Sequence, residues 1–137
     1  MKKRIFITII GIMTLMPACG QASVLHYDSV QSLADFEISA NSTAIFMENN
    51  PDLKLIDVRE PSEFEESNIK GAINIPLGNL SEESLEKNGI GKTSEIILYC
   101  RSGRRSAVAY EIIKPLGYIN SKSMAGGITA WVEEKSR

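Results

Sequence analysis

The sequence predicts a single α/β domain in which a parallel sheet carries helices on both faces. Short apolar stretches rich in β-branched residues alternate, over residues 36–134, with segments whose apolar residues recur at helical spacing. Strands that alternate with helices are typical of βαβ units, whose strands run parallel. The 137 residues are enough for one domain and too few for two.

The expected strands are short, mostly apolar and bounded by polar, Gly or Pro residues. They are 36–38, 54–58, 71–75, 96–99 and 120–123. Pro76 ends the third strand, because proline cannot donate to a sheet ladder. Residues 23–35 show no period, and we expect them to form an extended lead-in.

The expected helices lie between these strands and are marked by capping residues, prolines and glycines. The first expected helix is capped by Ser39 or Asn41 and ends before Pro51. The next three cover 61–66, 80–85 and 104–114, and the last follows the Gly126-Gly127 pair. Ser81 is the expected cap of the weak helix at 80–85. The last helix carries Ile128 and Trp131, which we expect to lie in the core. We expect Gly126 and Gly127 to form the turn before it.

Residues 1–22 have the composition of an export signal. Lys2, Lys3 and Arg4 precede the apolar run 5–16, and small residues follow it at 18, 20 and 22. The apolar run is too short to span a membrane, which favours a cleaved signal peptide over an anchor helix. We therefore expect an exported, periplasmic protein.

Two cleavage sites compete in this segment. Residues 16–19 resemble a bacterial lipoprotein signal, in which Cys19 would carry the lipid, although Met16 and Pro17 depart from that pattern. Small residues at Gly20 and Ala22 instead favour ordinary cleavage after Ala22, the outcome we prefer. A membrane partner, and a lipid-anchored envelope location, are expected only if Cys19 is acylated.

The cysteine count makes Cys100 conspicuous. The chain has two cysteines, and either cleavage removes Cys19 or blocks it with lipid. The mature protein would then hold one thiol and no internal disulfide. An unpaired cysteine in an exported protein indicates reactivity or intermolecular pairing.

Composition excludes several classes of function. Hydrophobic residues make up 43% and charged residues 23% of the chain, and the net charge is −2, which is ordinary for a globular domain. The absence of a long basic stretch argues against nucleic acid as a partner. No histidines and cysteines stand at metal-ligand spacing, so we expect no metal and no cofactor. We expect a monomer.

Cys100 lies in a loop that favours the thiolate. It follows the strand 96–99 and precedes the helix 104–114, and its neighbours are Arg101, Ser102, Gly103, Arg104 and Arg105. Loop amides, a helix N-terminus and guanidinium groups all stabilise an ionised sulfur. Ser106 adds a hydroxyl and is a candidate helix cap. The sequence therefore predicts a nucleophilic cysteine with an anion site beside it.

Four motifs in order resemble those of rhodanese domains. They are 57–64 with 69–76, the loop 100–106, Gly117-Tyr118, and 126–131. The resemblance covers about 38–131, and a single-domain exported bacterial rhodanese is the overall match. One departure is Asn68, where such domains often have His; Asn can donate a hydrogen bond but cannot change charge.

The resemblance implies a five-stranded parallel sheet and a sulfurtransferase that works through a persulfide on Cys100. The implied donor is a small sulfur anion such as thiosulfate, and the implied acceptor is cyanide or a thiol. The resemblance also implies that Arg101 faces the incoming anion, and Arg104 or Arg105 can clamp an oxyanion. Ser102 and Gly103 complete the expected binding loop. Asp57 and Arg59, by contrast, are expected to form a buried structural pair or to satisfy loop amides.

Two other functions use similar loops. Cysteine phosphatases and arsenate reductases space Cys and Arg by five residues, whereas here Ser106 stands at that place and Arg105 comes one earlier. The shorter loop favours a sulfur atom over a phosphoryl group. The second alternative is a non-enzymatic sulfur carrier or redox binding module that uses the same cysteine.

Overall fold

The computed structural model of the chain describes residues 36–137. The expected signal segment 1–22, Cys19 and the lead-in 23–35 therefore lie outside the described residues. Within residues 36–137, no helix has the length and apolar character that crossing a membrane requires.

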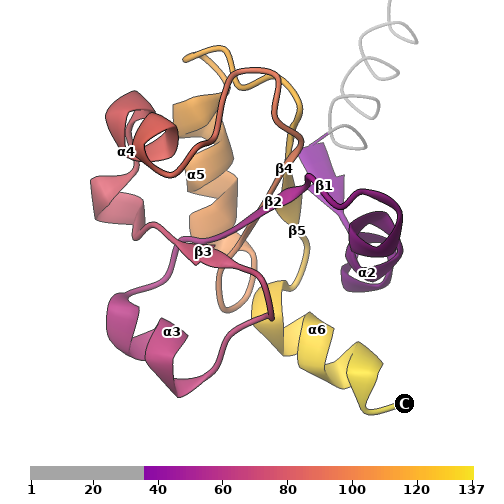
Figure 1. Ribbon diagram of the computed structural model, residues 1–137. Helices are drawn as coiled ribbons and strands as arrows, with labels where there is room; N and C mark the ends of the chain where they lie inside the picture. The colour runs from indigo at the N-terminus through magenta and orange to yellow at the C-terminus, as the bar shows by residue number, and fades with distance from the viewer. Residues whose placement is uncertain (1–35) are drawn as a thin grey trace, which may run out of the picture.

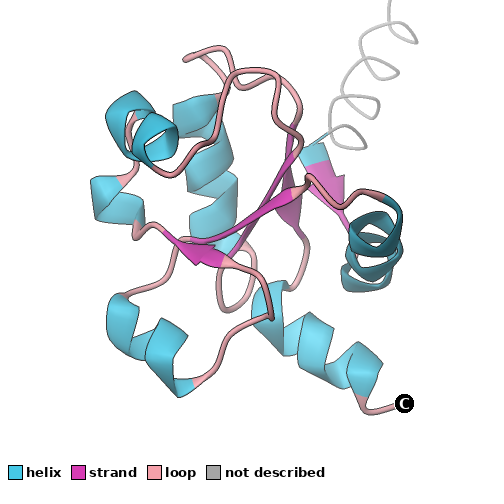
Figure 2. Ribbon diagram, viewed as in Figure 1, coloured by secondary structure: helices cyan, strands magenta, loops and turns pink. Residues whose placement is uncertain are grey.

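Five parallel strands form one sheet in the order β1-β5-β4-β2-β3 (Figures 1 and 2). The strands are β1 (Glu37–Ile38), β2 (Lys54–Asp57), β3 (Ile73–Asn74), β4 (Ile96–Tyr99) and β5 (Ser121–Met124). This confirms the predicted fold class. The third strand is shorter than the predicted 71–75, because only Ile73 and Asn74 pair with β2.

The helices are α2 (Ala40–Asn49), α3 (Pro61–Glu66), α4 (Glu82–Lys87), α5 (Arg104–Ile113) and α6 (Gly127–Lys135), with a short 3-10 turn η1 (Leu77–Asn79). Ser39 is the N-cap of α2, since its hydroxyl accepts the Ser42 N–H at 3.0 Å, which decides between the two predicted caps. Ser81 caps α4 as predicted, but the helix starts at Glu82 rather than Leu80. The sequence analysis missed η1.

Each face of the sheet is buried against helices. Ile96, Leu98 and Cys100 pack into one core cluster with residues of α4 and α5, while Ile97 and Tyr99 pack into the other with α2 and α6. Figure 1 shows α4 and α5 on one side of the strands and α2 on the opposite side. Side chains of a strand alternate between faces, so a strand buried on both sides reads as a continuous apolar run.

The register brings together the loops that follow β2 and β4. Asp57 and Tyr99, the last residues of these strands, are paired, and the Val58 N–H donates to the Tyr99 carbonyl at 3.0 Å. After β2 the chain continues into α3, and after β4 it continues into the Cys100 loop. Carboxyl ends of adjacent parallel strands are where α/β folds place their sites.

Candidate active site

Cys100 lies at the end of β4, immediately before the turn into α5. Its side chain is buried, with 1% of the residue exposed. It lines a hollow of about 390 Å³, and the structure gathers most of the predicted site residues around this hollow. The lining residues are Cys100, Arg101, Ser102, Arg104, Arg105 and Val108. Gly103, also a predicted site residue, is not among these lining residues, but its backbone N–H contacts the sulfur.

Loop hydrogen bonds stabilise the thiolate form of Cys100. Burial opposes ionisation, but the N–H groups of Ser106, Ser102 and Gly103 and the Ser106 hydroxyl outweigh it, so the pKa of Cys100 is lowered. The Gly103 N–H donates to Sγ at 3.2 Å. Gly103 has φ +94°, a left-handed conformation that suits glycine and turns this N–H inward. Hydrogen bonds, more than the predicted guanidinium groups, account for the lowered pKa of Cys100.

Ser106 contacts the sulfur through its hydroxyl and is not the helix cap that its position indicated. The N-cap of α5 is Gly103, and the Ser106 Oγ donates to the Gly103 carbonyl at 3.0 Å. The same hydroxyl lies 3.8 Å from the Cys100 Sγ. Ser123 of β5 donates to the Ser106 Oγ at 2.8 Å and is fully buried. A hydroxyl chain from β5 thus supports the thiol, which the sequence analysis missed because Ser123 belongs to no motif.

The N-terminus of α6 holds the carbonyl side of the Cys100 loop. The Ile128 N–H donates to the Cys100 carbonyl at 2.8 Å, and the Thr129 N–H and hydroxyl donate to the Arg101 carbonyl at 3.2 and 3.0 Å. Gly127 has φ +57°, and a Cβ there would lie 2.3 Å from the Cys100 carbonyl oxygen. Gly127 is therefore more than the turn residue we predicted, because it allows α6 to approach the loop.

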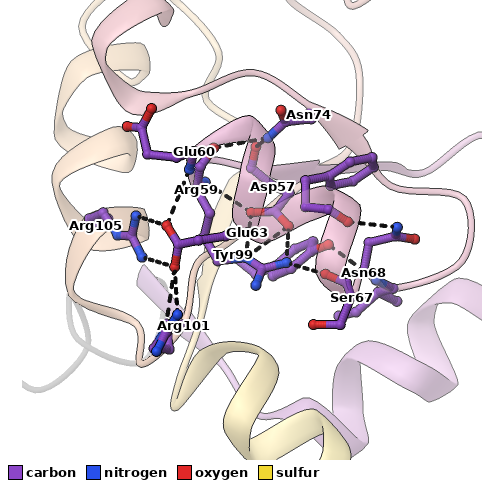
Figure 3. Close-up of polar contacts among 12 residues, drawn as sticks. Asp57, Arg59, Glu60, Glu63, Ser67, Asn68, Asn74, Tyr99, Arg101 and Arg105 are labelled. Carbon is purple, nitrogen blue, oxygen red and sulfur yellow. Dashed lines mark hydrogen bonds and ion pairs between the residues drawn. The ribbon is translucent and has the colours of Figure 1, made fainter.

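Glu63 of α3 reaches across to two of the loop arginines (Figure 3). Arg105 donates to both of its carboxylate oxygens, with Nη1 at 2.6 Å from Oε2 and Nη2 at 2.9 Å from Oε1. Arg101 donates to Oε1 at 3.1 Å through Nη2. The Arg105 hydrogen bonds lower the pKa of Glu63 to about 2, with contributions from Glu60 and Arg101.

The sequence analysis assigned no role to Glu63, although it lies in the quoted motif 57–64. The order of the strands is the signal that could have identified Glu63 as a site residue. If the strands at 54–58 and 96–99 are neighbours, an acid in the helix after one strand lies close to arginines after the other.

Asp57 and Arg59 form the buried ion pair that the sequence predicted. The Arg59 Nη2 lies 2.7 Å from the Asp57 Oδ2, and the exposed fractions of the two side chains are 3% and 0%. Arg59 also donates to the Ser67 carbonyl at 2.6 Å, which ties the start and the end of α3 to β2. Asn68 donates to the Phe64 carbonyl at 3.0 Å, a structural hydrogen bond of the kind expected there. This corner fixes the helix that presents Glu63.

Among residues 36–137, no group of three or more His, Cys, Asp or Glu side chains is arranged to hold a metal ion. Cys100 is a free thiol. The described part of the chain thus holds a buried thiol beside a hollow that three arginines line.

Known proteins share this arrangement of strands and motifs. Residues 42–134 match the family model described as "Rhodanese-like domain". A "Sulfurtransferase" of Allochromatium vinosum is 30% identical over 95 residues, covering 69% of this chain and 86% of the relative. The "Thiosulfate:glutathione sulfurtransferase" of Saccharomyces cerevisiae is 35% identical over 94 residues, covering 61% of this chain and 68% of the relative.

A solved structure agrees with these matches. The crystal structure of a rhodanese-related protein from Thermoplasma volcanium superposes with a TM-score of 0.60 at 33% identity, covering 72% of this chain and 92% of that one. The chain spans less than two thirds of the length of several other curated relatives that it matches. With the family model covering most of the domain and the cysteine loop in the matched region, the chain belongs to the rhodanese-like domain family.

Proposed function

We propose that the protein is a sulfurtransferase that carries sulfane sulfur on Cys100. The observation that carries this proposal is the thiol itself: it is buried, has a lowered pKa, and receives the Gly103 N–H at 3.2 Å. A sulfur held this way is both a nucleophile and, once loaded, a sheltered persulfide. Sulfurtransferases among the relatives support the same reaction class.

The reaction divides into two balanced displacements. The Cys100 thiolate attacks the outer sulfur of a donor such as thiosulfate, an S–S bond forms on Cys100, and sulfite leaves with the electron pair of the broken S–S bond. An acceptor, cyanide or a thiolate, then attacks the terminal sulfur, and the Cys100 thiolate leaves in turn. No external oxidant or reductant is needed, because sulfane sulfur moves between nucleophiles.

The loop residues have distinct roles in this proposal. The N–H groups of Ser102 and Gly103 and the Ser106 hydroxyl stabilise the thiolate before and after transfer. Arg101, Arg104 and Arg105 line the hollow through which a small anion would approach. The reaction requires no metal or cofactor.

We also propose that the protein works outside the cytoplasm, in the periplasm or as a lipid-anchored envelope protein. The support is the charged start, apolar run and small residues of 1–22. Cleavage after Ala22 would leave Cys100 as the only thiol, and acylation of Cys19 would do the same with an anchor. The mass of the purified protein distinguishes the two.

Thiocyanate formation from thiosulfate and cyanide tests the proposed function. We expect turnover by the wild-type protein and none by Cys100→Ser, because an alcohol does not ionise near neutral pH. The variant should stay folded, since the substitution is nearly isosteric. Turnover by the serine variant, or hydrolysis of a phosphate ester in place of sulfur transfer, would contradict the proposal. Loading without turnover would instead identify a sulfur carrier.

A further inference from the structure

The three arginines at the mouth of the Cys100 hollow are not equivalent. Arg101 and Arg105 both donate to the Glu63 carboxylate, and Arg105 does so with both terminal nitrogens. Arg104 is exposed and makes no ion pair within residues 36–137. The two arginines closest to Glu63 therefore already bind a carboxylate, which has the planar oxygen pair that a guanidinium prefers.

Glu63 is held firmly in this position. Only 17% of its side chain is exposed, and the Glu60 N–H donates to its Oε2 at 3.3 Å. Its pKa of about 2 keeps it ionised at any physiological pH. The helix that carries it is tied to β2 through Arg59, which binds both Asp57 and the Ser67 carbonyl. An incoming anion must compete with a carboxylate that is fixed in place.

This arrangement penalises one class of donor. Thiosulfate is a dianion whose sulfonate oxygens bind guanidinium groups as a carboxylate does, so it competes with Glu63 for Arg101 and Arg105 or relies on Arg104. It also approaches a fixed negative charge. A persulfide R–S–SH whose R group carries no carboxylate has no oxyanion group and needs neither arginine to reach Cys100.

We propose that Glu63 is a specificity-determining residue that directs the site toward low-molecular-weight persulfides without a carboxylate and away from sulfonate-bearing donors. This rests on the proposed sulfur transfer through Cys100. In the step, the Cys100 thiolate attacks the outer sulfur of R–S–SH and forms a new S–S bond. The donor S–S bond breaks, and R–S⁻ leaves with its electron pair, while the proton stays on the transferred sulfur or passes to water. Glu63 takes no part in bond making and acts through Arg101 and Arg105.

The test compares Glu63→Gln with wild type using two donors, thiosulfate and 2-hydroxyethyl persulfide, whose organic group carries no carboxylate. Glutamine keeps the size of the side chain but removes the charge that occupies the arginines. We expect the KM for thiosulfate to fall about fivefold, which corresponds to about 1 kcal/mol, with little change in the KM for 2-hydroxyethyl persulfide. Glu65→Gln is the matched control, because it removes the same charge from an exposed position of the same helix and should leave both donors unchanged.

A second readout is independent of sulfur transfer. Sulfate should protect Cys100 from iodoacetamide about fivefold better in Glu63→Gln than in wild type, because the freed arginines bind it. A raised thiosulfate KM, or equal changes for both donors, would overturn the assignment of Glu63, since the residue would then position the arginines or simply support the fold. Failure of the proposed function is distinguishable from this, because neither donor would then load the wild-type protein.

Discussion

At the scale of single residues, the pKa of Cys100 depends on where its neighbours donate hydrogen bonds. Three loop N–H groups and one hydroxyl offset the burial that would otherwise keep the thiol protonated. Two of the three loop arginines, Arg101 and Arg105, are instead bound by Glu63. Charge near a thiol and hydrogen bonds to it are thus provided by different residues.

Ser106→Ala should make Cys100 less reactive near neutral pH. The variant loses the hydroxyl 3.8 Å from Sγ, which is one of the groups that lower the thiol pKa. A hydrogen bond contributes about 0.5–1.5 kcal/mol, so thiolate content and iodoacetamide alkylation should fall about two- to tenfold at neutral pH. In a pH titration of the alkylation rate, the midpoint should move upward.

Ser102→Ala provides the control for this titration, because Ser102 acts on the thiol through its backbone N–H and that group survives the substitution. An unchanged midpoint in Ser106→Ala would show that the backbone alone sets the thiolate. Ser106→Ala also leaves the buried Ser123 hydroxyl without its acceptor, so the double variant with Ser123→Ala should recover part of any lost stability.

At the scale of elements, α6 determines the shape of the Cys100 loop. Its first N–H groups bind the Cys100 and Arg101 carbonyls, so those carbonyls face α6 while the following N–H groups face the sulfur. Helix N-termini present unsatisfied N–H groups that bind such oxygens. The contact is possible only because Gly127 has no side chain.

Gly127→Ala should damage both stability and reactivity. The new Cβ would lie 2.3 Å from the Cys100 carbonyl oxygen and 2.5 Å from that of Arg101, at φ +57°. Left-handed strain costs about 1–2 kcal/mol and overpacking typically about 1–3 kcal/mol more. We expect a clear fall in the free energy of unfolding in denaturant, together with slower alkylation of Cys100.

Gly71→Ala separates the two costs in that experiment. Gly71 has φ +87°, but nothing lies within 4 Å of its Cβ position. Its substitution should therefore show the strain alone and leave the thiol unaffected. Equal losses of stability in the two variants, with normal alkylation in both, would mean that α6 does not shape the loop.

At the scale of the whole molecule, the sequence predicted the architecture well because its signals are local. The strand 96–99 and the helix from 104 follow from periodicity, and the Asp57–Arg59 pair follows from its place beside a buried strand. The motifs that surround Cys100 identified the loop. Each of these features depends on residues close together in the chain.

The contacts that tune the site could not be predicted in the same way, because they join distant segments. Glu63 meets Arg105 across 42 residues, Ser123 meets Ser106 across 17, and Thr129 meets Arg101 across 28. They exist because parallel strands β2, β4 and β5 bring their ends to one edge of the sheet. Only the strand order, which the sequence pattern left open, makes these residues neighbours.

The mass of the intact protein after incubation with excess thiosulfate shows whether Cys100 carries sulfane sulfur. Sulfur transfer through Cys100 predicts that the wild-type protein gains one sulfur atom, that cyanide removes it, and that Cys100→Ser gains none. The same spectrum reports whether the N-terminus begins after Ala22 or at an acylated Cys19. A wild-type protein that gains no sulfur from thiosulfate or from a persulfide, while its thiol remains free to react with iodoacetamide, would contradict the account.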